Sequence, residues 1–302
     1  MQKVAILLTI KNGDKYLNAQ LKSLIEQKKV KIDIYASDDG STDNSLKLIN
    51  KFKNIHKNKI KKIYKNNFKS AAKNFHFLIN KVNTSYDYYA FSDQDDIWKK
   101  NKISNAIKML EKGYDLYGSR TILIDEFGKK IGKSLNFNKK PSFKNALVQN
   151  IAGGNTMVFS KKLFRDIQNL RIKDSPSHDW FVYIYSSFKG YFIYYDHKPS
   201  IYYRQHKENY IGSNLGLLNQ IKRIIWTFRG RFRKWNNFHE KLINKFFIHG
   251  NEKSKQNFLL FQKCRKSRIF FLKHLVLDKF PFYRQTFLGD LLLKVSLILK
   301  LL

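Results

Sequence analysis

The chain has 302 residues, of which 43% are hydrophobic, enough to bury one substantial core and a smaller second one. A formal net charge of +35 at pH 7 indicates an anionic partner. Nucleic acid is one candidate, and the distribution of the charge along the chain is what distinguishes it from other anionic partners. A single cysteine, Cys264, excludes an intrachain disulfide and fits a reducing compartment.

Strands and helices are predicted to alternate along the first hundred residues. Continuous apolar runs are typical of buried strands in parallel sheets, and apolar residues spaced by three and four positions indicate amphipathic helices. The strands are expected at 3–10, 32–36, 60–64 and 88–92, and the helices at 16–25, 46–52 and 70–82. This order predicts an α/β fold with a mostly parallel sheet and helices on both faces.

Three carboxylates follow the fourth predicted strand within four positions: Asp93, Asp95 and Asp96. Like charges this close raise one another's pKa unless a divalent cation or several donors neutralise them. Oxygen ligands suit Mg²⁺ or Mn²⁺, which complete their shell with water and phosphate. The alternative is a solvated acidic turn that caps a helix expected to begin near Trp98.

Polar residues also follow two other predicted strands. Thr9 lies at the end of the first, and Asp38 and Asp39 follow the second. In parallel sheets, ligands bind beyond the carboxyl ends of the strands, so these side chains and the acidic cluster are expected to share one edge. Such convergence favours a ligand site over a solvated turn.

These residues resemble glycosyltransferase family 2, whose catalytic domain has the GT-A fold. The motifs are Thr9, Ser-Asp-Asp-Gly-Ser-Thr-Asp at 37–43, Ser-Asp-Gln-Asp-Asp-Ile-Trp at 92–98, Gly-Gly-Asn-Thr-Met-Val-Phe at 153–159, His-Asp-Trp at 178–180, and Tyr-Arg-Gln-His-Lys-Glu-Asn at 203–209 with Ile211-Gly212. The later motifs look like the acceptor half of rhamnosyltransferase-like members. The resemblance covers about residues 1–212.

The resemblance implies a role for each matching position. It implies a catalytic base at Asp179, nucleotide or donor contacts at Thr9, Asp38, Asp39, Asp93 and Arg204, metal ligands at Asp95, Asp96 and His206, and an acceptor or sugar pocket around Gly153, Gly154, Asn155, His178 and Trp180. His178 stands where the family usually has an acidic residue. Purely structural alternatives remain for three of these positions: Asp179 could be a helix N-terminal acid, His206 a solvated residue at a strand end, and residues 153–154 a simple turn.

The implied activity is metal-dependent, inverting transfer of a sugar from a nucleotide diphosphate to a lipid-linked or polysaccharide acceptor. The stretch 204–206 favours dTDP-rhamnose by resemblance, and a UDP-hexose stays open. A divalent cation would stabilise the leaving diphosphate, and one carboxylate would deprotonate the acceptor. Two other classes remain: a catalytically inactive membrane-bound scaffold, and a nucleic-acid binder, disfavoured because it leaves the carboxylates unexplained.

The composition changes after residues 212–214. We therefore expect a GT-A catalytic domain at 1–214, with a nucleotide-sugar half at about 1–100 and an acceptor half at about 101–214, followed by a helical tail at 215–302. The tail carries 19 Lys and Arg against four acidic residues, interleaved with bulky apolar side chains.

This mixture suits an anionic membrane surface at the cytoplasmic face of the plasma membrane. The apolar segment 287–302 is too short and too charged to span a bilayer, so it is expected to lie in the interface or to dock onto the catalytic domain. Exposed basic helices could also mediate a homodimer.

Overall fold

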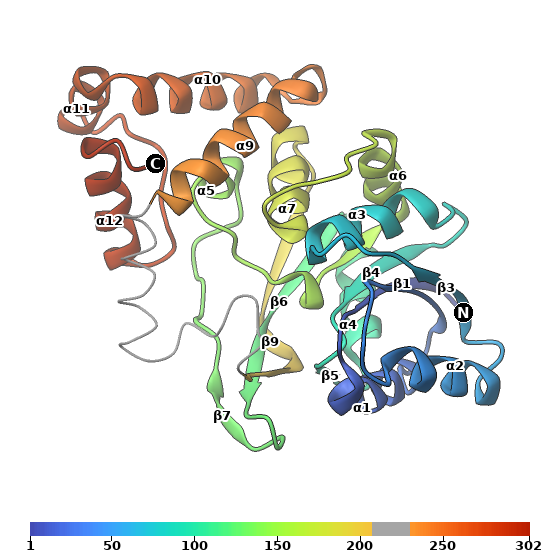
Figure 1. Ribbon diagram of the computed structural model, residues 1–302. Coiled ribbons are helices and arrows are strands. Elements are labelled where there is room, and N and C mark those ends of the chain that lie inside the picture. Colours follow the sequence, from blue (N-terminus) through green and yellow to red (C-terminus); the bar gives the residue numbers. More distant parts are fainter. Residues whose placement is uncertain (207–229) are drawn as a thin grey trace.

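The computed structural model describes residues 1–206 and 230–302, and Figure 1 shows how their elements are arranged. The domain boundary predicted at 214 and the motif residues 207–212 lie outside these ranges. The strands are β1 (Lys3–Ile10), β2 (Lys31–Asp38), β3 (Ile60–Lys65), β4 (Tyr88–Ser92), β5 (Ile97–Trp98), β6 (Leu116–Ile124), β7 (Lys130–Lys133), β8 (Val158–Ser160) and β9 (Ile193–Arg204). The α-helices are α1 (Asp14–Ile25), α2 (Ser45–Ile55), α3 (Ala71–Lys81), α4 (Lys102–Leu110), α5 (Phe143–Ala146), α6 (Lys161–Asn169), α7 (His178–Lys189), α9 (Arg231–Lys245), α10 (Glu252–Lys266), α11 (Arg268–Val276) and α12 (Phe287–Ile298).

The described strands form one sheet in the order β3-β2-β1-β4-β8-β6-β9-β5, with β7 paired to β6. Strands β3, β2, β1 and β4 are parallel to one another, as the alternating sequence pattern predicts. Strand β8 is antiparallel to both β4 and β6, and β6 and β9 are again parallel. The predicted α/β class and the first four strands are confirmed.

Helices cover both faces of the sheet, and β1 contributes to the core on each side (Figure 1). Neighbouring residues of a strand point to opposite faces, so Val4 and Ile6 pack with α1, α2 and α4. Ala5 and Leu7 pack in the other core, with α3, α6 and α7. This burial on both faces explains why the sequence of β1 is continuously apolar.

The strand register brings the carboxyl ends of three parallel strands to one edge. Thr9 of β1 lies opposite Ser37 of β2, and Leu8 lies opposite Ser92 of β4. The loops after β1, β2 and β4 therefore leave the sheet side by side. This is the edge at which the sequence pattern predicts a ligand site.

The helix expected to begin near Trp98 is wrong. Ile97 and Trp98 form the short strand β5, which pairs antiparallel with β9, and α4 begins only at Lys102. The backbone N–H of Trp98 donates to Ser23 Oγ at 3.0 Å. Because strand pairing and this side chain already bind the backbone, the helix starts four residues later.

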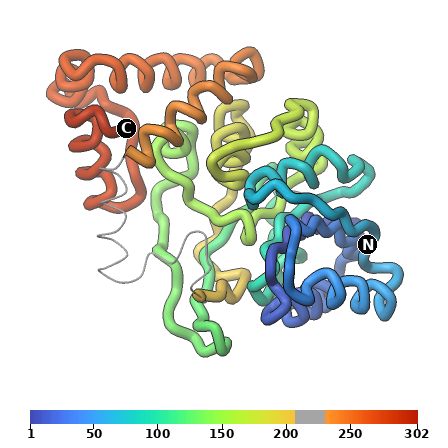
Figure 2. The backbone as a smooth tube through the Cα atoms, in the orientation of Figure 1, coloured from blue at the N-terminus to red at the C-terminus, as the bar shows by residue number. Residues whose placement is uncertain are grey.

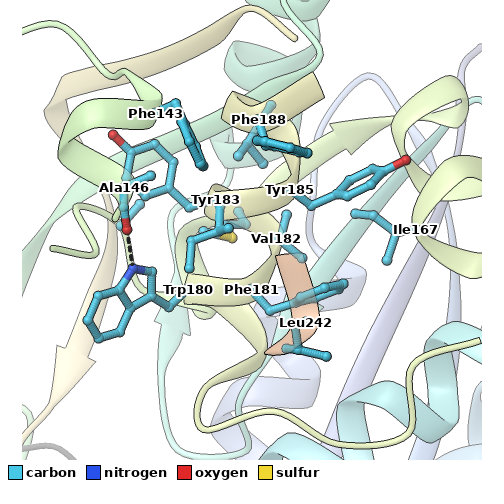
Figure 3. Packing of buried hydrophobic residues seen from close by; sticks show 14 of the residues in the cluster. Phe143, Ala146, Ile167, Trp180, Phe181, Val182, Tyr183, Tyr185, Phe188 and Leu242 are labelled. Carbon is cyan, nitrogen blue, oxygen red and sulfur yellow. Dashed lines mark hydrogen bonds between the residues drawn. The ribbon is translucent and has the colours of Figure 1, made fainter. Parts of the chain in front are cut away.

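The C-terminal helices pack against α7 through an aromatic core. Phe246, after α9, is fully buried, and its ring lies 6.3, 5.2 and 5.6 Å from the rings of Phe181, Tyr185 and Phe188. Figure 3 shows the α7 side of this cluster together with Leu242 of α9. The backbone trace in Figure 2 follows α9 to α12 as one layer beyond α7. Within the described ranges, no helix has the length and apolar character needed to cross a membrane.

We predict that Phe246→Ala lowers the free energy of unfolding by about 3–5 kcal/mol, because it leaves a cavity in this core. The matched control is Ile248→Ala, whose side chain is 80% exposed and whose loss should change stability by less than about 0.5 kcal/mol. Urea denaturation measures both, and equal effects would contradict a shared core.

Candidate active site

The two carboxylates after β2 shape the loops around them. Asp38 Oδ2 accepts hydrogen bonds from the backbone N–H groups of Gly40 and Ser41 at 3.1 and 3.0 Å. Asp39 accepts from three successive backbone N–H groups at 68–70, including that of Ser70 at 2.9 Å. Both aspartates are buried. Asp39 thus holds the loop after β3 against the end of β2, where Thr9 is also buried.

Gln94 joins the loop after β1 to the acidic loop after β4. Its Oε1 accepts from Lys11 N at 2.6 Å, and its Nε2 donates to Lys11 O at 2.7 Å. The Lys11 ammonium donates to the carbonyl of Asp39 at 2.9 Å. A Cβ at Gly13 would lie 2.4 Å from Gln94 Oε1, so the pairing needs a glycine there. Three strand ends are thus linked directly.

Asp96 is fully buried, and both of its carboxylate oxygens have partners. Oδ2 accepts from Asn155 Nδ2 at 2.6 Å, and Oδ1 accepts from Arg204 N at 3.3 Å. Burial raises the pKa of Asp96 well above its ordinary value, and the nearby charges of Asp95 and Asp93 add to this effect. Asp96 therefore connects the acidic loop to two segments more than fifty residues away.

Asp95 faces the end of β9. Its Oδ2 lies 2.8 Å from His206 Nε2, and its carbonyl accepts from Arg204 Nε at 3.0 Å. Arg204 also donates to the carbonyl of Glu126 at 2.9 Å and lies over the Tyr16 ring, 4.7 Å from its centroid. The guanidinium that resemblance assigns to the donor is thus bound into the framework around Asp95.

Asp93 is the carboxylate that links the acidic loop to α7 electrostatically. Burial raises its pKa to about 7, and repulsion from Asp95 and then Asp179 contributes further, while Lys102 opposes the shift. The predicted donor-side aspartate and the predicted base are therefore close enough to feel each other's charge. The fold brings these two residues together from segments 86 positions apart.

Asp179 lies in the first turn of α7 and is held by hydrogen bonds on both oxygens. Oδ2 accepts from Gly154 N at 3.0 Å, and Oδ1 accepts from Ser177 Oγ and from Trp180 N. Positive charge at a helix N-terminus favours an ionised carboxylate. Asp179 is thus both a helix N-terminal acid and a side chain oriented by the 153–154 backbone.

The His178 ring lies so close to Gly154 that it leaves no room for a side chain at position 154. The ring stacks on Phe75 with centroids 3.8 Å apart, and a Cβ at Gly154 would lie 2.3 Å from Nε2. Only glycine fits there without movement. Among the described residues, Nε2 of His178 has no hydrogen-bond partner. Trp180, by contrast, points into the core, where its indole N–H donates to Ala146 O at 2.7 Å (Figure 3).

The acidic edge can supply part of a metal shell. Asp95 Oδ2 and His206 Nε2 lie 2.8 Å apart, within hydrogen-bond distance of each other, whereas both carboxylate oxygens of Asp96 accept hydrogen bonds from other residues. Within residues 1–206 and 230–302, no group of three His, Cys, Asp or Glu side chains forms a complete site. One carboxylate and one imidazole fit a cation that takes its remaining ligands from phosphate and water, which is how Mg²⁺ commonly binds.

Sequence reasoning missed Gln94, Lys11 and Lys102. Gln94 lies inside the acidic motif, and its residue type alone does not distinguish a structural amide from a solvent-exposed one. Lys102 belongs to the run Lys99-Lys100-Asn101-Lys102, and nothing in this run marks one lysine as buried. Sequence can place such residues near the site, but it cannot show which of them turn inward.

The sheet and its edge define the class of the protein. Solved glycosyltransferase structures share the fold: TarS 1–349 of S. aureus in complex with UDP-GlcNAc aligns with a TM-score of 0.55 at 15% identity, covering 92% of this chain and 88% of that chain. The mannosyltransferase PcManGT from Pyrobaculum calidifontis, in complex with GDP-Man and Mn²⁺, aligns with a TM-score of 0.53 at 11% identity, covering 97% and 86%. The fold of this chain is therefore GT-A.

Sequence comparison gives the family. Residues 5–168 match the model described as Glycosyl transferase family 2, and the chain belongs to that family. It is 33% identical over 291 residues to dTDP-rhamnosyl transferase RfbG of Shigella flexneri, across 89% of this chain and 99% of the relative. It is 35% identical over 111 residues to UDP-Glc:alpha-D-GlcNAc-diphosphoundecaprenol beta-1,3-glucosyltransferase WfaP of Escherichia coli, across 37% and 42%. The resemblance seen in the sequence motifs is confirmed.

We predict that His178 stays neutral throughout the physiological pH range, because burial lowers its pKa to about 4. The unfolded imidazole takes up a proton first on acidification. The contribution of His178 to the free energy of unfolding is therefore complete above about pH 6.5 and is lost as the pH falls to about 4. Two-dimensional NMR of the imidazole nitrogens measures the midpoint, with His178→Gln to assign the signal. Protonation already half complete at pH 6 would contradict the burial argument.

Proposed function

We propose that the enzyme transfers rhamnose from dTDP-rhamnose, with inversion at the anomeric carbon, to a lipid-linked or polysaccharide acceptor. The observation that supports the chemistry is the carboxylate of Asp179, which accepts a hydrogen bond from Gly154 N and whose charge helps to raise the pKa of Asp93 in the acidic loop. Inversion in one displacement needs one base on the acceptor side, and His178 carries no carboxylate that could form a covalent intermediate.

In this mechanism the acceptor hydroxyl attacks the anomeric carbon while Asp179 takes its proton. The bond between that carbon and the diphosphate oxygen breaks, and the nucleotide diphosphate leaves with the electron pair. Asp95 and His206 are the side chains that would hold Mn²⁺ or Mg²⁺, with Asp96 behind them. The cation's role when bound is to neutralise charge on the leaving diphosphate.

The choice of donor rests on the relatives. RfbG, a relative that the chain matches over 89% of its length, is named for dTDP-rhamnosyl transfer, which favours dTDP-rhamnose. WfaP is named for UDP-Glc and covers a smaller share, so a UDP-hexose is the second candidate. Thr9, Asp38 and Asp39, at the carboxyl ends of β1 and β2, are the residues that we propose bind the nucleotide, and Asp39 accepts hydrogen bonds from the backbone at 68–70.

We expect Asp179→Asn to lower the rate of sugar transfer by about 10²- to 10⁴-fold, because the amide cannot accept the acceptor's proton. Binding of the donor should be retained, since Asp179 acts on the acceptor side. Asp174→Asn is the matched control: the side chain of Asp174 is 42% exposed and pairs with the surface residue Lys73 at 3.7 Å.

The assay follows transfer from dTDP-rhamnose, UDP-glucose and GDP-mannose with Mn²⁺, Mg²⁺ or EDTA. A thermal shift in parallel ranks the donors, because ligand at about 100 times Kd adds roughly 2.7 kcal/mol of stability. Full activity in EDTA would rule out the metal, and full activity of Asp179→Asn would rule out the base. Donor-dependent stabilisation without any product would favour the alternative, a catalytically inactive scaffold.

We further propose that α11 and α12 rest on an anionic membrane surface at the cytoplasmic face. The solvent-facing side of α11 carries Ile269, Leu272 and Val276, spaced by three and four residues; Ile269 and Val276 are 82% and 83% exposed. Helix α12 exposes a second apolar stripe that begins at Phe287, which is 87% exposed. The two helices pack against each other at one end of the molecule (Figure 1). Soluble monomers rarely expose apolar stripes of this kind.

The charge around these stripes points to lipid. Residues 230–302 contain 16 Lys and Arg against four acidic residues. From residue 263 to residue 302 the exposed cations are Lys263, Lys266, Arg268, Lys273, Lys279 and Lys300. Apolar side chains flanked by cations match an anionic interface, where each near-surface cation contributes about 1 kcal/mol. Leu293 and Leu297, on the other side of α12, are buried and anchor the helix to the protein.

We predict that the double variant Val276→Gln, Phe287→Gln lowers binding to vesicles containing phosphatidylglycerol by at least about tenfold. The variant removes two exposed apolar side chains that would be buried in the lipid interface on binding. The matched control, Ile55→Gln with Phe192→Gln, removes residues 66% and 69% exposed elsewhere. Vesicle flotation measures binding. Equal losses of vesicle binding in both variants would contradict the proposed surface. So would light scattering that shows a wild-type dimer and a monomer only for the α11–α12 variant, because the stripes would then form a dimer interface.

A further inference from the structure

Lys102, the first residue of α4, is a lysine whose side chain is almost completely buried. Its ammonium donates to the carbonyl of Asn155 at 2.7 Å and lies 3.0 Å from the centroid of the Trp98 ring. Lysine is seldom buried to this extent unless it is paired. The position is also unfavourable for a cation, because the N-terminus of a helix carries partial positive charge.

Burial of this ammonium costs free energy, because the charged group loses its hydration. Desolvation lowers the pKa of Lys102 well below its ordinary value, although the charges of Asp96 and Asp93 oppose the shift. Lys102 forms no ion pair within 4 Å among those found in the described residues. The hydrogen bond that its ammonium donates goes to the main chain of the turn at 153–155.

That turn holds the two sides of the active site together. The Asn155 side chain donates to Asp96 at 2.6 Å, on the donor side. One residue earlier, Gly154 N donates to Asp179 Oδ2 at 3.0 Å, on the acceptor side. A shift of the turn would therefore move the base relative to the acidic loop. The Lys102 ammonium binds the main chain of the same turn, at the carbonyl of Asn155.

We propose that Lys102 is a positioning residue, which fixes the turn at 153–155 through the Asn155 carbonyl and thereby orients Asp179 toward the acceptor. Lys102 does not touch the substrates. The Trp98 ring holds the ammonium in place from the other side, so the acidic loop, α4 and the turn form one unit. The inference deepens the proposed function, on which its catalytic readout rests.

The catalytic readout is the partition between transfer and hydrolysis of the donor. A base displaced by about 1 Å costs about 10²-fold in a step that depends on its alignment. Hydrolysis by water needs less alignment, because water enters from many directions. In Lys102→Met, transfer should therefore fall by at least about tenfold more than hydrolysis does. A loss of folded protein would lower both rates in proportion.

The structural readout does not depend on sugar chemistry. Hydrogen exchange followed by mass spectrometry reports on peptides that cover residues 150–158, where the N–H groups of Gly154, Thr156 and Met157 are hydrogen-bonded. In Lys102→Met we expect these amides to exchange at least about tenfold faster, with β1 unchanged. Lys102→Gln keeps a neutral donor and should restore most of the protection. Lys108→Met, on the exposed side of α4, is the matched control.

Several results would overturn the proposal. Unchanged exchange at 150–158 in a folded Lys102→Met protein would do so, and so would transfer and hydrolysis that fall in parallel. If the methionine variant does not fold, Lys102→Gln decides alone: a loss of transfer greater than about tenfold, with the turn still protected, would show that alignment by the hydrogen bond is not the role. If the wild type transfers no sugar, the proposed function fails, while the exchange experiment still tests the turn.

Discussion

The architecture depends on gathering negative charge at the carboxyl ends of parallel strands. The loop that carries Asp93, Asp95 and Asp96 leaves the sheet on the same edge as the loop that carries Asp39. Burial raises the pKa of Asp93 to about 7, and repulsion from Asp95 and Asp179 adds to this shift. Several groups offset the repulsion among these carboxylates: backbone N–H groups donate to Asp39, the Asn155 amide donates to Asp96, and the charge of the buried Lys102 lowers the pKa of Asp93. If a divalent cation binds with the donor diphosphate as proposed, it would reduce the repulsion among these carboxylates.

The sequence predicts the first half of the fold because its pattern is local. Apolar runs and helical spacing place β1 to β4 and the intervening helices, and parallel pairing follows from their alternation. Past Ser92 the local pattern is a poor guide, since long-range pairing determines the structure. Ile97 and Trp98 form a strand only because β9, a hundred residues later, lies beside them. A single sequence contains no periodic signal for a two-residue strand of this kind.

The candidate site shows the same division. The motifs identify Asp93, Asp95, Asp179 and His206 as polar residues at strand and helix ends, and the fold brings them to one edge. The motifs do not show that Asp96 is enclosed, that Trp180 points into the core, or that Lys102 turns inward. Those facts depend on which hydrogen-bond partner each side chain meets after folding. Residue type identifies the chemistry that is available, whereas packing determines which groups can reach a ligand.

The C-terminal helices contribute to the same site through the segment that joins α11 to α12. Asn145 Nδ2 donates to Tyr283 O at 2.9 Å, Arg284 Nε donates to Val148 O at 3.1 Å, and Gln285 N donates to Gln149 Oε1 at 2.7 Å. These contacts hold the chain a few residues before the turn at 153–155, while Phe246 packs on the helix that carries Asp179. Asp179, the proposed base, therefore has supporting contacts on two sides: the turn at 153–155, to which Lys102 donates, and the C-terminal helices. If α11 and α12 rest on a bilayer as proposed, the same contacts set the height and direction at which Asp179 meets an acceptor anchored in that bilayer.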